Sequence, residues 1–213
     1  MKEIEVKQTL DDIRDMMSKS SRFQAISGWS IIVIGVFAAI ASLMAATVIG
    51  IVDVPFFGNL QRYATLNTPT KIQAAAVIAL VLFTVCLLTV FIFAIVKSKR
   101  HNLRFTFDKR MAQMLLAFFI PLLAGGLFSM AMVLQHHYGL TSSIMLMFYG
   151  LALINCSHYT YPILRWLGYT ELLIGIIDCF TMSHALLFWF LGFSVAHILF
   201  GIIYVIMFDR KTE

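Results

Sequence analysis

The sequence predicts an all-α membrane protein, a bundle of six transmembrane helices preceded by an amphipathic helix. Of the 213 residues, 60% are hydrophobic and 13% are charged, and the mean hydropathy is +0.87. A soluble domain is about half apolar and about a quarter charged. The apolar residues also fall in long runs, as crossing a bilayer requires. Finally, the basic residues gather between these runs on one side, which is typical of membrane topology.

Residues 1–24 are predicted to form a cytoplasmic amphipathic helix. Val6, Leu10, Ile13 and Met17 recur at intervals of three or four residues, which places them on one helical face. The mixed charges and the lack of a short apolar core with a cleavage site argue against a signal peptide. Such a helix lies on the membrane surface or docks on a partner. The alternative is a solvated helix that leads into the first span.

Six apolar runs follow, separated by short polar segments with Pro and Gly as breakers. The predicted transmembrane bundle, residues 25–208, has spans at residues 25–52, 72–96, 111–135, 141–161, 166–183 and 185–208, and residues 209–213 form a cytoplasmic tail. In the first span, Gly28, Gly35, Ser42 and Ala45 form a stripe of small residues that lets another helix approach closely. That helix belongs either to the same chain or to a second copy in a homo-oligomer.

The distribution of Lys and Arg predicts the orientation of the bundle. Of the 16 basic residues, 14 lie in residues 1–22, residues 97–110, the turn at Arg165 and the tail, all on one side of the predicted spans. Only Arg62 and Lys71 lie on the other side. By the positive-inside rule, both termini are therefore cytoplasmic. The net charge of +5 reports topology in this interpretation, and a nucleic-acid partner is not indicated.

The second half of the chain carries ionisable residues at membrane depth, where they are costly and often mark working sites. In the fifth span, Gly168, Glu171, Gly175 and Asp178 follow one another at helical spacing. Both carboxylates therefore share one stripe, about 10 Å apart along the helix axis. We expect this stripe to face the interior of the bundle.

Polar residues on the neighbouring spans extend this pattern. Ser194, His197, Gly201 and Tyr204 repeat the same spacing in the sixth span, and Asn155 lies near His158 and Tyr159 in the fourth. The candidate ligand-binding or ion-path residues are Asn155, Tyr159, Arg165, Glu171, Asp178, His197 and Tyr204. By depth, Asn155, Tyr159, Glu171 and Tyr204 fall in the cytoplasmic third, His197 near the midplane and Asp178 in the outer third. This predicts a cytoplasm-facing pocket of Arg165, Glu171, Asn155 and Tyr204, and a proton or cation ladder of the two acids with His197.

Each of these side chains also has a purely structural interpretation. In that interpretation, Glu171 pairs with Arg165, Asp178 reaches the outer headgroups or His184, Asn155 links two helices, and His197 donates to a carbonyl group. Intramembrane ionisable residues are enriched at working sites but are not confined to them. The sequence leaves both interpretations open.

Signatures of catalysis, cofactors and metals are missing. The chain has no HExxH, no GxSxG and no Gly-rich phosphate loop. Cys86, Cys156 and Cys179 lie in apolar runs without CxxC spacing, so we interpret them as small buried hydrophobes. A bis-histidine haem site lacks an interior histidine in the first three spans. No cofactor and no metal site is predicted.

Several short segments resemble a group of uncharacterised bacterial six-span inner-membrane proteins. They are AISGWSIIVIGVFAAIA (25–41), FYGLALIN (148–155), SHYTYPILRWLGYTELLIG (157–175) and FWFLGFSVAHILFG (188–201). The resemblance implies the six-span architecture and a bacterial cytoplasmic membrane. It implies no activity and no functional residues.

Three classes of function fit these observations. The leading one is a non-enzymatic membrane protein that binds or senses a small-molecule or lipid ligand, or a partner, through a polar pocket in its second half. The second is a small transporter or channel with Glu171, Asp178 and His197 as a proton or cation path. The third is an intramembrane enzyme, which copurified metal or haem would reveal.

Overall fold

In the computed structural model, the residues described are 27–50, 68–100, 109–181 and 184–209. Within these ranges the chain is all helical and contains no strand. The long helices are α2 (Gly28–Ile49), α4 (Thr68–Arg100), α5 (Lys109–Leu134), α6 (Thr141–Cys156) and α7 (Ile163–Thr181), and a short turn η2 (Tyr138–Leu140) precedes α6. The predicted amphipathic helix at 1–24 lies outside the described residues.

The last helix runs without interruption from Ala185 to Asp209, and we call it the C-terminal helix. It consists of α8 (Ala185–Phe190), the π-helical segment η3 (Leu191–Ala196), α9 (His197–Tyr204) and a second π-helical segment η4 (Val205–Asp209). A π-helical turn holds one residue more than an α-helical turn and is common at functional sites. The η3 segment lies between α2 and α7 and contacts both helices.

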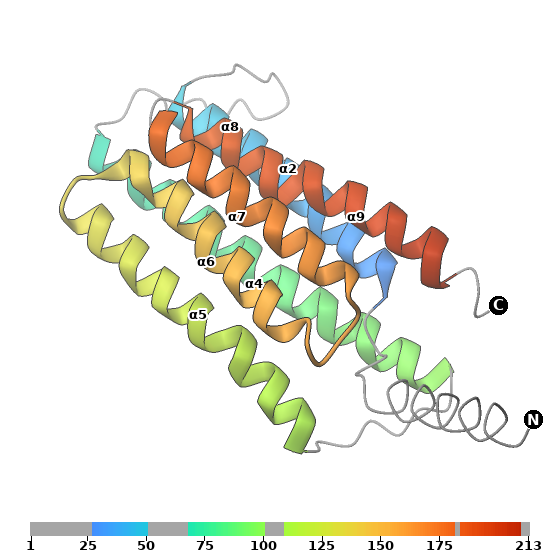
Figure 1. Ribbon diagram of the computed structural model, residues 1–213. Coiled ribbons are helices and arrows are strands. Elements are labelled where there is room, and N and C mark those ends of the chain that lie inside the picture. Colours follow the sequence, from blue (N-terminus) through green and yellow to red (C-terminus); the bar gives the residue numbers. More distant parts are fainter. Residues whose placement is uncertain (1–26, 51–67, 101–108, 182–183, 210–213) are drawn as a thin grey trace, which may run out of the picture.

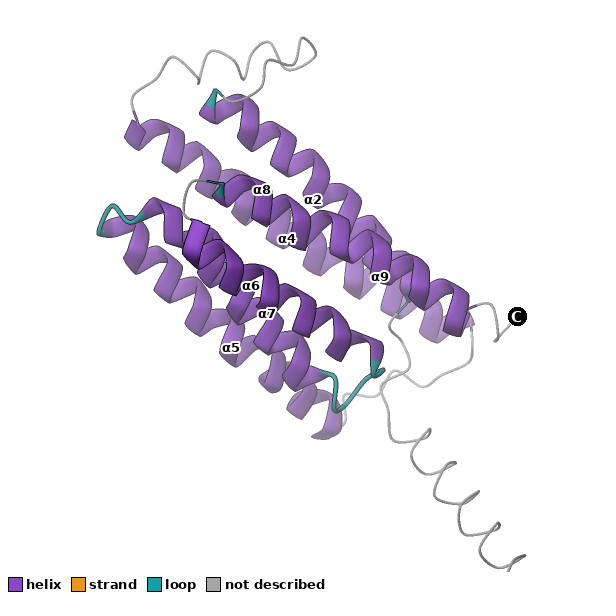
Figure 2. Ribbon diagram, turned by 45° about the horizontal axis from the view of Figure 1, so that its top comes forward, coloured by secondary structure: helices purple, strands orange, loops and turns teal. Residues whose placement is uncertain are grey.

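The C-terminal helix lies between two groups of helices (Figures 1 and 2). On one side, α5, α6 and α7 pack in that order, and on the other side α2 packs with α4. The C-terminal helix contacts α2, α6 and α7, whereas α4 packs mainly on α2 and α5 mainly on α6. The outer edges are therefore α4 and α5, and the most enclosed part of the molecule is where α6, α7 and the C-terminal helix meet.

Helices that follow one another in the chain run antiparallel, so every second connection lies at the same end of the bundle. The basic residues gather at one of these two ends. Helices α2, α5 and α7 begin, and α4 and the C-terminal helix end, on the same side of the bundle (Figure 1). The described Lys and Arg residues at or near these ends are Lys97, Lys99, Arg100, Lys109, Arg110 and Arg165, and Lys71 lies near the opposite end. We call the end of the bundle that carries these six residues the basic end.

Several helices are able to cross a membrane by length and composition, which confirms the coarse prediction. Among the described residues there are five, Gly28–Ile49, Pro69–Lys99, Lys109–Leu134, Tyr138–Cys156 and Ala185–Met207. Helix α7 has 19 residues, about 28 Å at 1.5 Å per residue. It is not among these five because its sequence contains three charged residues, Arg165, Glu171 and Asp178, and is therefore less apolar than that of the others. Two of these face the interior, and its outward side chains are large and apolar.

Small residues bring α2 and the C-terminal helix close together. A Cβ atom added at Gly35 would lie 2.7 Å from Ile198 Cγ1 and 2.9 Å from the Ser194 carbonyl oxygen. Gly35 and the rest of the predicted stripe, Gly28, Ser42 and Ala45, are buried. The predicted close approach is confirmed, and the partner helix belongs to the same chain. This face of α2 is therefore covered without a second copy.

Glycines also set the distance between α6 and α7. A Cβ atom at Gly150 would lie 2.7 Å from the Gly168 carbonyl oxygen, and one at Gly168 would lie 2.7 Å from the Gly150 carbonyl oxygen. The two backbones therefore touch at this crossing, as small residues permit between membrane helices. The contact turns the predicted stripe of α7 toward α6 and the C-terminal helix.

The boundary between α6 and α7 differs from the predicted one. Helix α6 ends at Cys156, five residues before the end expected at residue 161, because residues 157–161 form turns closed by hydrogen bonds such as Thr160 Oγ1 to the Cys156 carbonyl, 3.2 Å. Helix α7 begins at Ile163, directly after Pro162, and so three residues earlier than expected. Proline is well suited to a helix start. The earlier start moves every residue of α7 deeper along the bundle.

Candidate functional site

A carboxylic acid, an imidazole and a phenol meet at mid-height of the bundle. Glu171 is the ninth of the 19 residues of α7, and Tyr149 is the ninth of the 16 residues of α6. His197 is the thirteenth of the 25 residues from Ala185 to Asp209. Glu171 is 0% exposed and His197 is 1% exposed. We call these three residues the interior cluster.

The imidazole of His197 is the centre of the cluster. Its Nδ1 lies 3.2 Å from Glu171 Oε1 and 3.1 Å from the Gly192 carbonyl oxygen, and its Nε2 lies 2.8 Å from the Tyr149 hydroxyl. Because a carbonyl oxygen only accepts, Nδ1 carries the hydrogen in the bond to Gly192. Nε2 then accepts from Tyr149 in the neutral ring and donates to the Tyr149 oxygen in the charged ring. The same contacts therefore suit both protonation states of His197.

The absence of a side chain at Gly192 leaves room for the carboxyl group of Glu171. A Cβ atom at this position would collide with Glu171 Oε2 and with Leu146 Cδ2. Gly192 belongs to η3, and its carbonyl group also accepts the hydrogen bond from His197. A larger residue would require the buried ends of Glu171 and Leu146 to move, so glycine at this position makes room for the acid beside η3.

Aromatic rings enclose the imidazole. The Tyr149 ring stacks on His197 with ring centroids 5.5 Å apart, and Phe193 lies against both rings. Neither carboxyl oxygen of Glu171 has a hydrogen-bond donor among the described residues beyond the ion-pair contact with His197. An ionised carboxylate in such surroundings is expensive unless it is paired. Among the described residues, a charged imidazole of His197 would supply such a pairing for an ionised Glu171.

Asp178 forms a second buried polar contact on the same face of α7. It is 0% exposed, and Ser143 on α6 donates a hydrogen bond of 2.9 Å to its Oδ2. Its Oδ1 has no partner among the described residues. Asp178 lies about 10 Å along the axis from Glu171, toward the end opposite the basic end. Gly168 and Gly175 are buried with the two acids, so the predicted inward stripe is confirmed.

The interior holds more acid than base. Among the described residues, the buried acidic and basic side chains are Glu171, Asp178 and His197. Even with a charged imidazole, two ionised carboxylates would leave one negative charge uncompensated. Burying an unpaired charge costs several kcal/mol or more. Ionising both acids at once would therefore require a positive charge beyond that of His197.

The structure corrects the predicted cytoplasm-facing pocket. Glu171 lies at mid-height beside His197 and not in the cytoplasmic third, because α7 starts earlier than expected. Arg165 contacts Ser157 Oγ at 3.2 Å and His158 Nδ1 at 3.3 Å, so it does not pair with Glu171. The Asn155 side chain is exposed. These residues do not form one pocket.

The remaining candidates lie apart from the interior cluster. Tyr204 is fully buried in a different contact, with its ring 5.2 Å from that of Tyr161 and packed with Ile31 and Leu164. Tyr159 is half-buried in the turn after α6. Of the predicted site residues, Glu171 and His197 are in contact with each other, and Asp178 is on the same face two helical turns away.

Three residues of the site were not among the predicted ones. Tyr149, Ser143 and Gly192 provide the hydroxyl groups and the close backbone contact. The sequence did contain a signal for Ser143. It lies seven residues before Gly150 on the same face of α6, just as Gly168 lies seven residues before Gly175 on α7. Nothing in the sequence pattern points to Gly192, because a π-helical segment has no periodic signature.

Metal ligands do not cluster in the described part of the chain. Among those residues, no group of three or more His, Cys, Asp or Glu side chains is placed to hold a metal ion. Cys86, Cys156 and Cys179 are free thiols.

Comparisons of the chain with protein-family models, with curated proteins and with solved structures find no match.

Proposed function

We propose that this chain is a six-span protein of a bacterial cytoplasmic membrane, with both termini and an amphipathic helix at residues 1–24 on the cytoplasmic side. The apolar helices and the gathering of basic residues at one end of the bundle support this orientation. The resemblance of residues 148–155 and 188–201 to uncharacterised inner-membrane proteins supports the bacterial assignment.

Within this membrane protein, the interior cluster binds a proton and acts as a sensor or switch, not as a catalyst. The observation that carries this proposal is the contact between Glu171 and His197, with both side chains shut off from solvent. An ionised Glu171 beside a neutral His197 carries one negative charge, and one added proton, on either group, leaves the pair without net charge. The contacts of His197 accommodate both the neutral and the charged ring. Because the cluster joins α6, α7 and the C-terminal helix, a change in its charge alters the packing of all three.

A proton fits this cluster better than a metal cation does. Sodium and calcium ions need several oxygen ligands, and calcium takes six to eight. The interior cluster provides the Glu171 carboxylate and one backbone carbonyl, and His197 Nδ1 lies on the side of the carboxylate where an ion would sit. The acid and the imidazole are the two groups that exchange a proton most readily near neutral pH.

Infrared difference spectroscopy tests the proposal directly. Lowering the pH of the purified protein in detergent is expected to change the infrared band of the Glu171 carboxyl group, as a C=O stretch if the added proton lies on the acid or as a shifted carboxylate stretch if it lies on His197. Glu171→Gln should abolish that band, whereas Asp178→Asn, on the same face, should leave it in place. A band that survives Glu171→Gln would contradict the proposal.

The second candidate is a proton-coupled transporter or channel. The observation that favours it is the position of Asp178, which continues the stripe from Glu171 toward the opposite end of the bundle. Liposomes with a pH gradient and a pH-sensitive dye distinguish the two functions. Gradient dissipation that is lost in both Glu171→Gln and Asp178→Asn would identify a transport path. An intact gradient, together with the infrared signal of Glu171, supports sensing.

A further inference from the structure

The α6–α7 turn carries a cationic group whose partners are all neutral. Arg165 Nε donates to Ser157 Oγ at 3.2 Å, and its Nη2 donates to His158 Nδ1 at 3.3 Å. These contacts hold the guanidinium group in one orientation. Its other N–H groups have no partner among the described residues, and no carboxylate there pairs with it. An arginine held in place without a counter-ion is suited to bind an anion.

His158 supplies a second donor beside the first. Because a guanidinium N–H only donates, Nδ1 of His158 accepts and the ring hydrogen is on Nε2. His158 is exposed at the surface of the turn. Arg165 and His158 together therefore present N–H donors near the surface of the turn, and phosphate oxygens accept hydrogen bonds from such donors.

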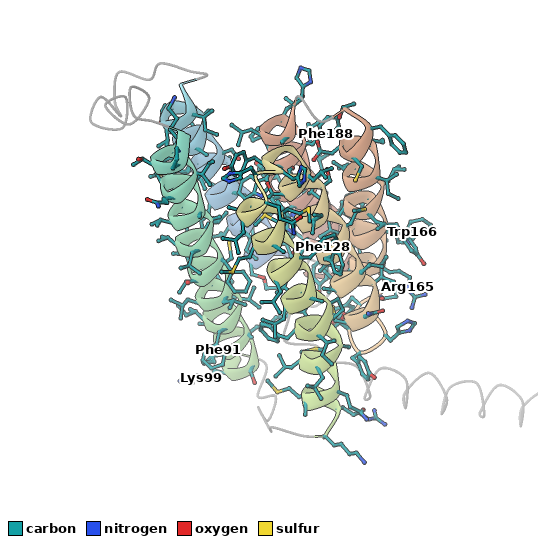
Figure 3. All side chains as sticks on the ribbon, turned by 90° about the vertical axis from the view of Figure 1, so that its left-hand side faces the viewer. Phe91, Lys99, Phe128, Arg165, Trp166 and Phe188 are labelled. Carbon is teal, nitrogen blue, oxygen red and sulfur yellow. The ribbon has the colours of Figure 1, made fainter. Side chains whose placement is uncertain are left out.

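Large apolar side chains continue from this point along the outer face of α7. Trp166 is 64% exposed, and its ring packs edge-on against that of Tyr169, with centroids 5.9 Å apart. Figure 3 shows the side chains of Arg165 and Trp166 projecting away from the bundle next to each other. Exposed apolar residues follow at helical spacing, namely Leu173, Ile176, Ile177 and Phe180. A Trp–Tyr pair between a charged group and an apolar strip is typical of the boundary between headgroups and acyl chains.

We propose that Arg165 and His158 bind the phosphate of an anionic phospholipid, with its acyl chains lying along Trp166, Tyr169, Leu173 and Phe180. The donors and the apolar strip begin on adjacent residues of one helix, as a headgroup and its chains require. In the proposed orientation this turn faces the cytoplasmic leaflet, whose anionic lipids attract basic residues near the membrane surface. The proposal rests on that orientation but not on the interior cluster.

Tryptophan fluorescence measures occupancy at this site. Trp29→Phe and Trp189→Phe leave Trp166 as the only tryptophan, next to Arg165. The variant is reconstituted in phosphatidylcholine vesicles that contain a small fraction of either brominated phosphatidylglycerol or brominated phosphatidylcholine. We expect the anionic lipid to quench Trp166 with about fivefold higher apparent affinity, the gain from one basic side chain at the membrane surface.

Matched variants separate a specific site from general charge. Arg165→Gln is expected to abolish the preference for the anionic lipid, whereas Lys99→Gln, on α4 at the same end and away from Trp166, should leave it unchanged (Figure 3). A variant that retains only Trp29, which is 57% exposed in the first turn of α2, should show no such preference. Equal quenching of Trp166 by the two lipids, or a preference that survives Arg165→Gln, would overturn the proposal.

Two further outcomes are informative about the ligand and the membrane. If soluble glycerol phosphate removes the preference at millimolar concentration, the site takes the phosphate group alone and the lipid assignment is wrong. If neither brominated lipid quenches Trp29 or Trp166, the chain does not lie in the bilayer as proposed. That result would refute the membrane orientation itself, so it is distinguishable from a failure of the lipid site.

Discussion

Glu171 and Asp178 are seven residues apart on one face of α7, and both are fully buried, yet their surroundings differ in kind. Glu171 faces an imidazole at 3.2 Å and a π-helical segment fitted to its carboxyl group. Asp178 faces a single serine hydroxyl, and no base contacts it in the described part of the chain. Burial is thus common to both acids, and the partner is what distinguishes them.

The difference has a chemical consequence. A proton on His197 compensates the negative charge of an ionised Glu171. The pair therefore has a form with one net negative charge and a form without net charge, and the contacts in the two forms are similar. The Ser143 hydroxyl offers Asp178 a dipole and no charge, so ionised Asp178 remains uncompensated. We therefore expect the loss of its partner to destabilise the protein more at Glu171 than at Asp178.

The largest effect is expected from His197→Leu, which removes the base and keeps most of the side-chain volume. Breaking one side of a buried pair costs about 3–5 kcal/mol, which for a chain of this size corresponds to about 10 °C in melting temperature. The melting temperature in detergent, followed by intrinsic fluorescence, provides the measurement. Adding Glu171→Gln should recover most of the loss, since no carboxylate is then left alone. Strictly additive losses in the double variant would show that the two residues do not interact.

A smaller effect is expected from Gly192→Ala, which tests whether the π-helical segment is fitted to Glu171. The new methyl group would collide with the carboxylate and with Leu146, and such overpacking costs about 1–3 kcal/mol. The matched control is Gly126→Ala on α5, where an added Cβ atom meets nothing within 4 Å. We expect the control to unfold in a dodecyl sulfate titration at or slightly above the parent concentration, and Gly192→Ala well below it. Equal unfolding midpoints for Gly192→Ala and Gly126→Ala would mean that Glu171, Leu146 or the backbone moves without cost, and that the segment is not fitted to Glu171.

The inward stripe of α7 could be predicted because helical spacing alone places Glu171 and Asp178 on one face. Their partners could not, since Tyr149 and Ser143 reach them only through the rotation of α6, which the contact between Gly150 and Gly168 sets. The expected depth of Glu171 was wrong because it depended on where α7 begins.

The pairing of Arg165 with Glu171, which belongs to one of the two interpretations that the sequence leaves open, is wrong for a reason that residue spacing explains. Side chains six residues apart lie on different faces of a helix, since neighbours on one face are three or four apart. Arg165 therefore turns outward to Ser157 and His158, while Glu171 turns inward. Spacing predicted the face of each acid, but assigning each its partner required the three-dimensional packing.

The smallest effects are expected at the second acid, and they decide whether the two acids differ. Asp178→Asn keeps the shape and the bond from Ser143 but removes a charge without a basic partner, so the melting temperature should stay at or above that of the parent. Ser143→Ala removes the only hydrogen-bond donor that Asp178 has among the described residues, and it should lower stability by about 1–2 kcal/mol. In the Asp178→Asn background the same serine change should cost less, because an amide tolerates the loss of a donor better than a carboxylate does. If Asp178→Asn instead destabilises the protein as much as His197→Leu, then Asp178 has a charged partner, and the contrast between the two acids does not hold.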